Sequence, residues 1–302
     1  MTSLNSTKST SELRVMAELT LLGAIWGGSF LLMRVAAPEF GPLALVELRL
    51  AFGALVLLPF VYRARRQLEG RWVTLFLIGI INSAVPFLLF AWATAVAPAA
   101  IAAIANSMTA LFAALIAGWM FGERLGPRRC IGLLAGMAGV IVMAGIPMAG
   151  VPVGWAALAA TAAALCYGFS GNLVRRYLGG LPPVALGGAT LACSALLVLP
   201  LALLYWPEHD ISPAAWGSAI MLGVLCTGIA YAFLFRLLDR IGAARTATVT
   251  YLVPLFGVAW AWIILGEPLT TGTLIAGILI LGGVALGQSR QPAPAALKQP
   301  RA

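Results

Sequence analysis

The amino-acid sequence predicts an all-α integral membrane protein, with ten transmembrane helices arranged as two inverted five-helix repeats around a central cavity. Three observations predict this fold: the apolar composition, the spacing of the apolar segments and an internal repeat. Of the 302 residues, 61% are hydrophobic and only 10% are charged, and the mean hydropathy is +0.98. A soluble domain cannot bury that much apolar surface. A disordered chain would be poor in apolar residues and rich in charge.

Ten apolar segments follow one another along the chain, each bounded by Pro, Gly or charged residues. In the first half, 17–35 follows a charged stretch, 43–62 lies between Pro42 and Arg63, 72–93 follows Arg71, 99–120 follows Pro98, and 127–147 starts at Pro127. In the second half, 153–174 ends before Arg175, 183–205 starts at Pro183, 214–237 follows Pro213, 243–265 ends before Gly266, and 270–288 ends before the basic tail. At about 20 residues per spanning helix, no room remains for a sizeable soluble domain. The alternating strands of a membrane barrel are absent.

These segments divide the chain into a tail at 1–16, a first repeat at 17–147, a second repeat at 153–288 and a tail at 289–302. The positions of Lys and Arg place both tails in the cytoplasm. Seventeen of the 19 basic residues lie on that side, and the exceptions are Arg34 and Arg49. The first segment lacks a small-residue cleavage site, so we expect a retained helix instead of a signal peptide.

Aligning the sequence with itself reveals the internal repeat. A shift of 141 residues lays the segment from Pro42 to Pro59 over that from Pro183 to Pro200, with both prolines matched. The same shift pairs Trp26, Gly27, Ser29 and Arg34 with Tyr167, Gly168, Ser170 and Arg175. A shift of 144 pairs Gly79, Ser83, Phe87, Gly122 and Glu123 with Gly223, Thr227, Tyr231, Gly266 and Glu267. Because five is an odd number, the two repeats cross the membrane in opposite directions.

The sequence resembles the EamA-type drug/metabolite transporter superfamily in its five-plus-five pattern, in Trp-Gly-Gly-Ser-Phe at 26–30 and in Gly-Glu at 122–123 and 266–267. Bacterial proteins that look like this include exporters of amino acids, aromatic ones among them. The resemblance implies a cavity lined by helices 1, 3, 4, 6, 8 and 9, with alternating access between two gates. One departure is Thr109-Ala110 in the first repeat against Val253-Pro254 in the second, which predicts a proline kink in helix 9 alone.

The substrate-binding site is expected near the midplane, between the repeats. Side-chain amides are costly in lipid unless they pair or face a cavity, which favours Asn82 and Asn106. Small hydroxyl residues also pack helices, and deep aromatic residues also fill cores, so both interpretations stay open for those types. The expected set is Trp26, Ser29, Asn82, Ser83, Phe90, Asn106, Tyr167, Ser170, Thr227, Tyr231, Thr250 and Tyr251. Such a lining suits a small amphipathic zwitterion.

Two charged residues, Glu47 and Arg49, lie inside the second segment, and their repeat counterparts are Gly188 and Thr190. Being two residues apart, they point to different faces of a helix, whereas Arg34 near the outer end of the first helix can reach Glu47. An interhelical ion pair is the favoured interpretation. The alternative makes Glu47 a proton-coupling carboxylate, or Arg49 an outer-gate cation that meets a leaving carboxylate.

Four further residues are expected to have structural roles. Glu123 and Glu267 lie where they can stabilise the N-termini of the fifth and tenth helices. Pro86 and Pro254 permit the helix bending that transport requires.

No catalytic site, cofactor or metal site is expected. The sequence lacks the Gly-rich loop that holds nucleotide phosphates, and the single histidine, His209, lies in an outer loop between Glu208 and Asp210. The four cysteines lie in or beside apolar segments, which gives no disulfide framework. The net charge of +9 is scattered between helices, so it indicates membrane orientation and no nucleic-acid partner.

The sequence therefore predicts an exporter of neutral or aromatic amino acids and related metabolites in a bacterial cytoplasmic membrane. The partners are a small-molecule substrate and the lipid bilayer, and a monomer is expected. One alternative is another substrate, such as a sugar phosphate, a nucleotide sugar or a cationic drug. A phosphate would need Lys or Arg at the midplane, and the middle thirds of the expected cavity helices contain none. An alternative of another class is a membrane receptor or assembly protein.

Overall fold

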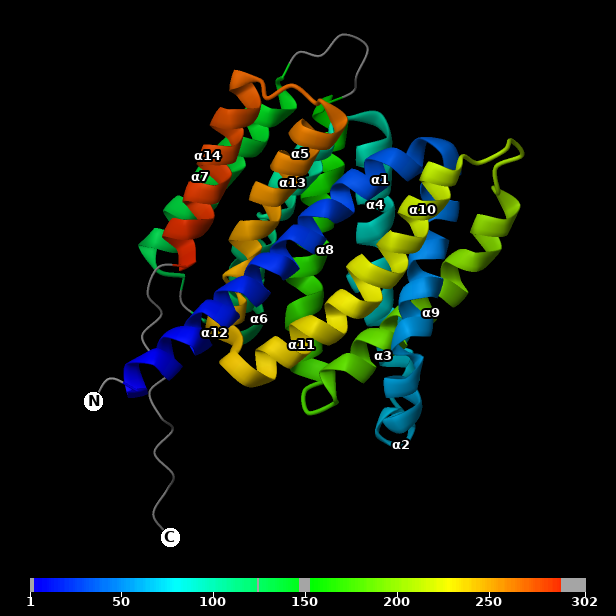
Figure 1. The fold of residues 1–302 in the computed structure, drawn as a ribbon, viewed down its shortest axis with the longest axis horizontal. Coiled ribbons are helices and arrows are strands. Elements are labelled where there is room, and N and C mark those ends of the chain that lie inside the picture. Colours follow the sequence, from blue (N-terminus) through cyan, green and yellow to red (C-terminus); the bar gives the residue numbers. More distant parts are fainter. Residues whose placement is uncertain (1–2, 124, 147–152, 289–302) are drawn as a thin grey trace.

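The computed structural model describes residues 3–123, 125–146 and 153–288, and the regular structure in these ranges is entirely helical (Figure 1). This confirms the predicted all-α fold. The predicted tail at 289–302 lies outside the described residues.

The first two spans form one helix, α1 (Ser3–Arg63), which turns back on itself at Gly41. The backbone there has φ 72° and ψ 160°, a conformation that Gly adopts without steric cost. The third span comprises α3, η1 and α4, and the fourth comprises α5 and α6. The bounds in this half are α2 (Arg65–Leu68), α3 (Trp72–Gly79), η1 (Ile80–Ala84), α4 (Val85–Val96), α5 (Ala99–Asn106), α6 (Thr109–Phe121) and α7 (Pro127–Ala144).

The second half repeats this order of elements. Its bounds are α8 (Val153–Tyr177), α9 (Pro183–Leu204), α10 (Pro213–Gly223), η2 (Val224–Ile229), α11 (Ala230–Ile241), α12 (Ala243–Thr246), α13 (Val249–Leu265) and α14 (Thr271–Gln288). Among the described residues, seven helical stretches are long and apolar enough to cross a membrane, and α13 and α14 are shorter apolar helices. Because α1 contains two spans, these helices account for the ten predicted crossings.

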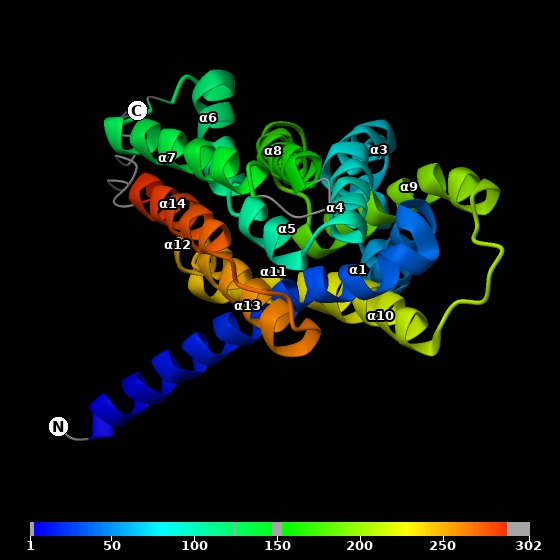
Figure 2. The same ribbon diagram turned by 90° about the horizontal axis from the view of Figure 1, so that it is seen from above.

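Close glycine contacts between the halves follow the predicted repeat. A Cβ atom on Gly27 of α1 would lie 2.6 Å from Cβ of Phe256 in α13. In the matching place, a Cβ atom on Gly168 of α8 would lie 2.9 Å from Cβ of Phe112 in α6. Each half thus inserts its first helix against the fourth span of the other half. At the periphery, α7 of the first half and α14 of the second lie side by side (Figures 1 and 2).

The third and eighth spans each contain a π-helical segment, which the sequence reasoning did not anticipate. In η1 the N–H of Val85 donates to the carbonyl of Ile80, and next to η2 the N–H of Ala230 donates to the carbonyl of Leu225. The two segments coincide under the shift of 144 residues. Pro86 follows η1, but Ala230 occupies its place after η2, so the proline is not what the two segments share. π-Helical turns inside α-helices are frequent at functional sites.

The two ends of the bundle differ in charge. The first turns of α1, α2, the turn between α8 and α9, and the turn between α11 and α12 lie at the lower end in Figure 1. The described arginines next to these elements include Arg63, Arg71, Arg175, Arg240 and Arg245. The charge asymmetry predicted from the sequence is present in the fold, while its orientation relative to the cytoplasm stays a prediction.

Candidate substrate-binding cavity

A cavity of about 560 Å³ lies between the two halves and extends to the turn between α8 and α9. Arg175 lines it at this turn, and its side chain is 60% exposed, so the cavity is accessible from what is named here the open end. The opposite end, at the loops that follow α4 and α13, is named the closed end. The lining also includes the second span and α9, which the resemblance did not imply.

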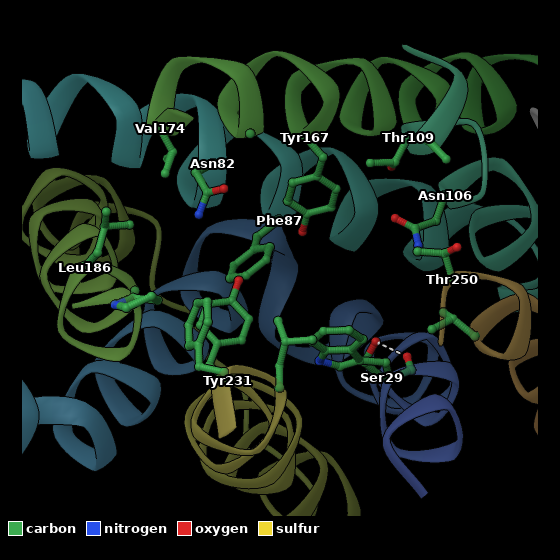
Figure 3. A pocket seen from close by; sticks show the side chains of 18 of the residues that line it. Ser29, Asn82, Phe87, Asn106, Thr109, Tyr167, Val174, Leu186, Tyr231 and Thr250 are labelled. Atoms are coloured by element: carbon green, nitrogen blue, oxygen red, sulfur yellow. Dashed lines mark hydrogen bonds between the residues drawn. The ribbon is translucent and has the colours of Figure 1, made fainter. Parts of the chain in front are cut away.

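Eight of the twelve predicted substrate-binding residues line the cavity (Figure 3). They come from α1, η1, α4, α5, α8, α11 and α13, and they are Trp26, Ser29, Asn82, Phe90, Asn106, Tyr167, Tyr231 and Thr250. The other four, Ser83, Ser170, Thr227 and Tyr251, are not part of the lining. The Tyr251 hydroxyl instead donates to the carbonyl of Val284 in α14, 3.4 Å away.

Two of these four residues hold the Asn82 amide in the cavity wall. The Ser170 hydroxyl donates to Oδ1 of Asn82 at 2.8 Å, and Nδ2 of Asn82 donates to the Ser83 hydroxyl at 3.3 Å. Both serines are almost fully buried. The two serines therefore orient the side chain of Asn82. They do not line the cavity themselves, so their part in the site is indirect.

Trp26 connects the first helix to η2. Its Nε1 donates to the carbonyl of Cys226 at 3.1 Å, and its own carbonyl accepts a hydrogen bond from the Ser29 hydroxyl at 2.6 Å. With its N–H paired, the indole presents an apolar ring to the cavity. Phe90 and Tyr167 extend this aromatic wall, with ring centroids 6.0 Å apart.

The break between α5 and α6 brings three polar residues to the cavity: Asn106, Ser107 and Thr109. The hydroxyls of Ser107 and Thr109 are buried and have no hydrogen-bond partner among the described residues. Buried polar groups in native proteins are nearly always paired, so these hydroxyls are free to bind a ligand or water. Asn106 was predicted from the sequence. Ser107 and Thr109 were not, because small hydroxyl residues are also common where membrane helices pack.

Arg49 lies in the cavity lining, whereas the sequence suggested an outer gate as one alternative for it. Its Nε donates to the Thr227 hydroxyl at 3.0 Å, and its guanidinium carbon lies 3.7 Å from the centroid of the Phe87 ring. Its side chain is buried, with the residue 6% exposed. The expectation of no midplane Lys or Arg considered helices 1, 3, 4, 6, 8 and 9 and left out the second span, so it did not include this cation of the cavity lining.

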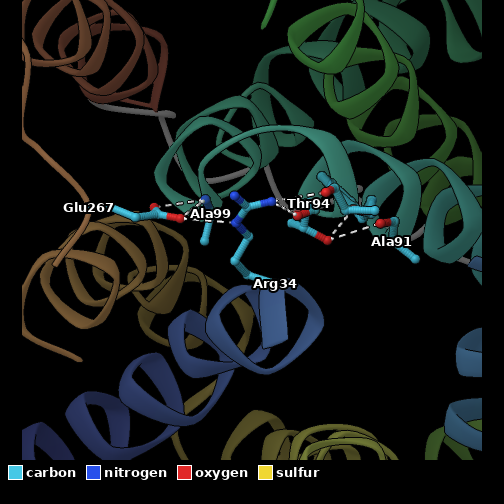
Figure 4. A network of polar contacts seen from close by, with 7 residues as sticks. Arg34, Ala91, Thr94, Ala99 and Glu267 are labelled. Carbon is cyan, nitrogen blue, oxygen red and sulfur yellow. Dashed lines mark hydrogen bonds and ion pairs between the residues drawn. The ribbon is translucent and has the colours of Figure 1, made fainter. Parts of the chain in front are cut away.

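The closed end is held by Arg34 and Glu267, whose Nε and Oε1 atoms are 3.3 Å apart (Figure 4). Arg34 also donates to the carbonyls of Thr94 and Ala95, both at 3.0 Å. Glu267 accepts the N–H of Ala99, the first residue of α5, at 2.9 Å. Burial raises the pKa of Glu267, against the opposing effects of the Ala99 amide and the Arg34 charge.

This arrangement corrects two predictions. Arg34 pairs with Glu267 of the second half, and no ion pair joins it to Glu47 in the part of the chain that the structure describes. Glu267 does stabilise a helix N-terminus, but that of α5 instead of the tenth helix. Both errors arose because each partner was expected on the next helix of the same half. The packing of the two halves instead brings loops of different halves into contact.

The open end contains the repeat-related copy of this ion pair. Arg175 and Glu123 correspond to Arg34 and Glu267, and their Nη1 and Oε1 atoms are 2.7 Å apart. Within the described ranges, no backbone carbonyl accepts from Arg175 and no helix N-terminus donates to Glu123. Glu123 thus takes part in an ion pair that the sequence did not predict, and its role at the start of the fifth helix stays a prediction. The pair is more exposed, with 60% of Arg175 and 36% of Glu123 accessible, against 32% and 12% in the closed-end pair.

Glu47 and the two prolines lie outside the cavity. Glu47 is 7% exposed, and its Oε2 has no hydrogen-bond partner among the described residues. Helix α13 continues through the buried Pro254, and the break in the ninth span falls earlier, at Ala247 and Thr248. Proton coupling through Glu47 stays a prediction. No group of three His, Cys, Asp or Glu among the described residues could hold a metal ion.

Comparison with known proteins gives consistent matches along the chain. A family model described as the EamA-like transporter family matches residues 16–145 and 154–287. A "probable amino-acid metabolite efflux pump" of Salmonella typhimurium is 27% identical over 280 residues, which cover 87% of this chain and 91% of that protein. A "probable terminal-alkyne amino-acid exporter" of Streptantibioticus cattleyicolor is 28% identical over 287 residues, covering 90% and 95%. A solved crystal structure shares the fold, with a TM-score of 0.61 at 24% identity over 89% of this chain and 94% of that chain.

Proposed function

The chain belongs to the EamA-like transporter family, and from this premise we propose that it exports neutral or aromatic amino acids and related small metabolites by alternating access. The observation that supports the proposal most directly is a cavity between the halves that is lined by residues of the open end, including Arg175 of the exposed ion pair, and not by the buried pair of Arg34 and Glu267 at the closed end. A bacterial cytoplasmic membrane is the proposed location.

The size and the lining of the cavity support a small amphipathic substrate. About 560 Å³ falls within the range of small-molecule sites. Trp26, Phe90 and Tyr167 provide apolar surface, and the Asn82 and Asn106 amides can bond an ammonium or a carboxylate. The names of the Salmonella and Streptantibioticus relatives agree with amino acids as the substrate class.

The inverted repeat supports alternating access. If the two halves exchange conformations, the open end acquires the contacts that now hold the closed end. With both tails in the cytoplasm, the cavity of this structure faces inward. Reporter fusions at the C-terminus and in the loop near His209 test this orientation, because only a cytoplasmic C-terminus with an external His209 loop agrees with it.

The transport proposal is tested with purified protein in liposomes, without ATP, using labelled phenylalanine, threonine and alanine. We expect saturable counterflow of at least one amino acid that protein-free liposomes lack. Comparing uptake with and without a pH gradient shows whether protons are coupled, and a dependence on the gradient would direct attention to Glu47. Movement of sugar phosphates or cationic drugs, with none of the amino acids, would overturn the amino-acid assignment.

A second candidate, an anionic metabolite such as a sugar phosphate, is favoured by one observation. Arg49 and Arg175 are the charged residues among the described lining, which contains no carboxylate. Guanidinium groups bind phosphate well. The same charge balance disfavours a cationic drug, because the cavity offers it no counter-ion.

A further inference from the structure

Arg49 is a buried cation without an opposite charge. Its residue is 6% exposed, and no Asp or Glu lies within ion-pair distance of it among residues 3–123, 125–146 and 153–288. Glu47, two positions away on the same helix, points to another face and does not line the cavity. A charge in the membrane interior is costly and is normally paired or functional.

The contacts of Arg49 leave part of its guanidinium unused. Nε donates to Thr227 and Nη1 to the sulfur of Met33 at 3.5 Å, while no hydrogen bond joins Nη2 to a described residue. The Phe87 ring covers one face of the group. Hydroxyl, thioether and aromatic ring orient the guanidinium, but all three are neutral. A guanidinium has five N–H donors, so donors remain for a ligand in the cavity.

The other half of the molecule shows that packing does not require a cation here. The counterpart of Arg49 is Thr190, which is fully buried and donates to the carbonyl of Leu186 in its own helix at 3.0 Å. The counterpart of Thr227 is Ser83, which is also fully buried. At this place one pair of spans packs with two hydroxyl residues, Thr190 and Ser83. The matching pair of spans packs with Arg49 and a hydroxyl residue.

We propose that Arg49 binds the anionic group of the substrate, a carboxylate in the case of an amino acid, through its free guanidinium edge. Thr227 and Phe87 hold the guanidinium in place, and the aromatic wall of Trp26 and Tyr167 contacts the apolar part of the substrate. The inference rests on the proposed transport function and adds what recognises the substrate. It predicts that the anionic group, more than the side chain, decides whether a molecule binds.

The test compares pairs of molecules that differ in this group alone: L-phenylalanine with L-phenylalaninamide, and glucose 6-phosphate with glucose. Binding to purified protein is measured by calorimetry, and transport by competition in liposomes. For the wild type we expect phenylalanine to bind about tenfold or more tightly than its amide. Arg49→Gln should remove this difference by weakening phenylalanine alone, and Arg49→Lys should restore part of it. Arg236→Gln, the same change at an exposed arginine of α11, is the matched control and should change neither affinity.

Each outcome separates this inference from the proposed function. If the wild type binds acid and amide equally, or if Arg49→Gln weakens both alike, Arg49 is structural and the inference is wrong. If phenylalanine is not transported but glucose 6-phosphate binds in an Arg49-dependent way, the amino-acid assignment fails and the role of Arg49 stands. If Arg49→Gln does not fold, the wild-type comparison still decides, and Thr227→Val should weaken phenylalanine selectively because the guanidinium loses its anchor.

Discussion

The two five-helix halves of the molecule share their backbone contacts and the charges at their ends, but differ in the side chains that face the cavity. Gly27 and Gly168 make matching close contacts, and η1 and η2 occupy matching places. The residues at the cavity, by contrast, differ between the repeats. The alignment of the two repeats pairs Arg49 with Thr190, Asn82 with Cys226 and Asn106 with Thr250. The shared features are those that the proposed exchange of conformations would require. The unshared features lie where we propose that a substrate, which lacks two-fold symmetry, is recognised.

The ion pairs extend this comparison to the two ends. In a single structure, one copy is half-buried and bonded to backbone groups, and the other is exposed. The repeat predicts what the exposed copy gains when its end closes. Arg175 would donate to the carbonyls of Leu238 and Asp239, and Glu123 would accept the N–H of Ala243, the first residue of α12.

Glu267→Gln should reduce transport by about tenfold or more and should lower the free energy of unfolding by about 1 to 2 kcal/mol. The change removes the charge that pairs with the half-buried Arg34 while the glutamine oxygen can still accept from Ala99. Initial uptake rates and thermal unfolding in detergent measure the two effects. Arg34→Gln should reduce the uptake rate and the free energy of unfolding by similar amounts. The double variant with Glu267→Gln should lose little more of either than each single variant. Independent, additive losses would show that the two residues do not act as a pair.

Glu123→Gln is the matched change at the open end, and it should slow transport by a few-fold with almost no loss of stability. Exposed ion pairs contribute about 0 to 1 kcal/mol, so the state described here barely depends on this pair. In the proposed opposite state, where the repeat predicts that this pair is buried, transport should depend on it. Measuring the unfolding temperature and the uptake rate of Glu123→Gln checks this prediction. A large loss of stability together with unchanged uptake would contradict it.

Trp26→Ala and Asn82→Ala should each weaken substrate binding by about five- to tenfold without preventing membrane insertion. Trp26 loses ring contact and its bond to Cys226, and Asn82 loses an oriented amide. Concentration dependence of uptake separates affinity from maximal rate. Trp262→Ala is the control, because Trp262 is 56% exposed on the outer surface of α13 and does not line the cavity. Unchanged transport in both test variants would remove these residues from the site.

Exchanging Asn106 and Thr250, as the double variant Asn106→Thr with Thr250→Asn, should change the relative affinity for different amino acids by about two- to threefold. Both residues line the cavity at matching places in the two halves. The exchange keeps the number of polar groups and moves the amide to the other side. A panel of competing amino acids measures the shift, and an identical order of preference would indicate that the substrate does not contact these positions.

The sequence was sufficient for the fold and for eight residues of the cavity wall. Polar and aromatic side chains in the middle of apolar spans have few places to go in a membrane, which is why Asn82, Asn106 and Tyr231 could be placed in the cavity. The contact between Arg34 and Glu267 was not predicted, although both had been matched to Arg175 and Glu123 by the repeat. An internal repeat relates positions to one another, but it does not reveal which loops meet when two halves pack together.

The place of Arg49 in the cavity lining was not predicted, for a different reason. Its place in the second span was known, but hydrophobic periodicity does not show how far a helix is tilted or rotated toward a cavity. The π-helical segments were missed because one inserted residue per turn leaves no mark on an apolar pattern. Pro86 hinted at irregular backbone in the third span, whereas no proline marks the same place in the eighth.

The single-residue turn at Gly41 has a mechanical consequence. Arg34 of the closed end and Arg49 of the cavity lie on the two arms of α1, with no flexible loop between the arms. A displacement of the arm that carries Arg49 would therefore be passed directly through Gly41 to the arm that carries Arg34. Lengthening this turn by a few residues would leave Arg34 and Arg49 in their sites, but would uncouple the movement of one arm from that of the other.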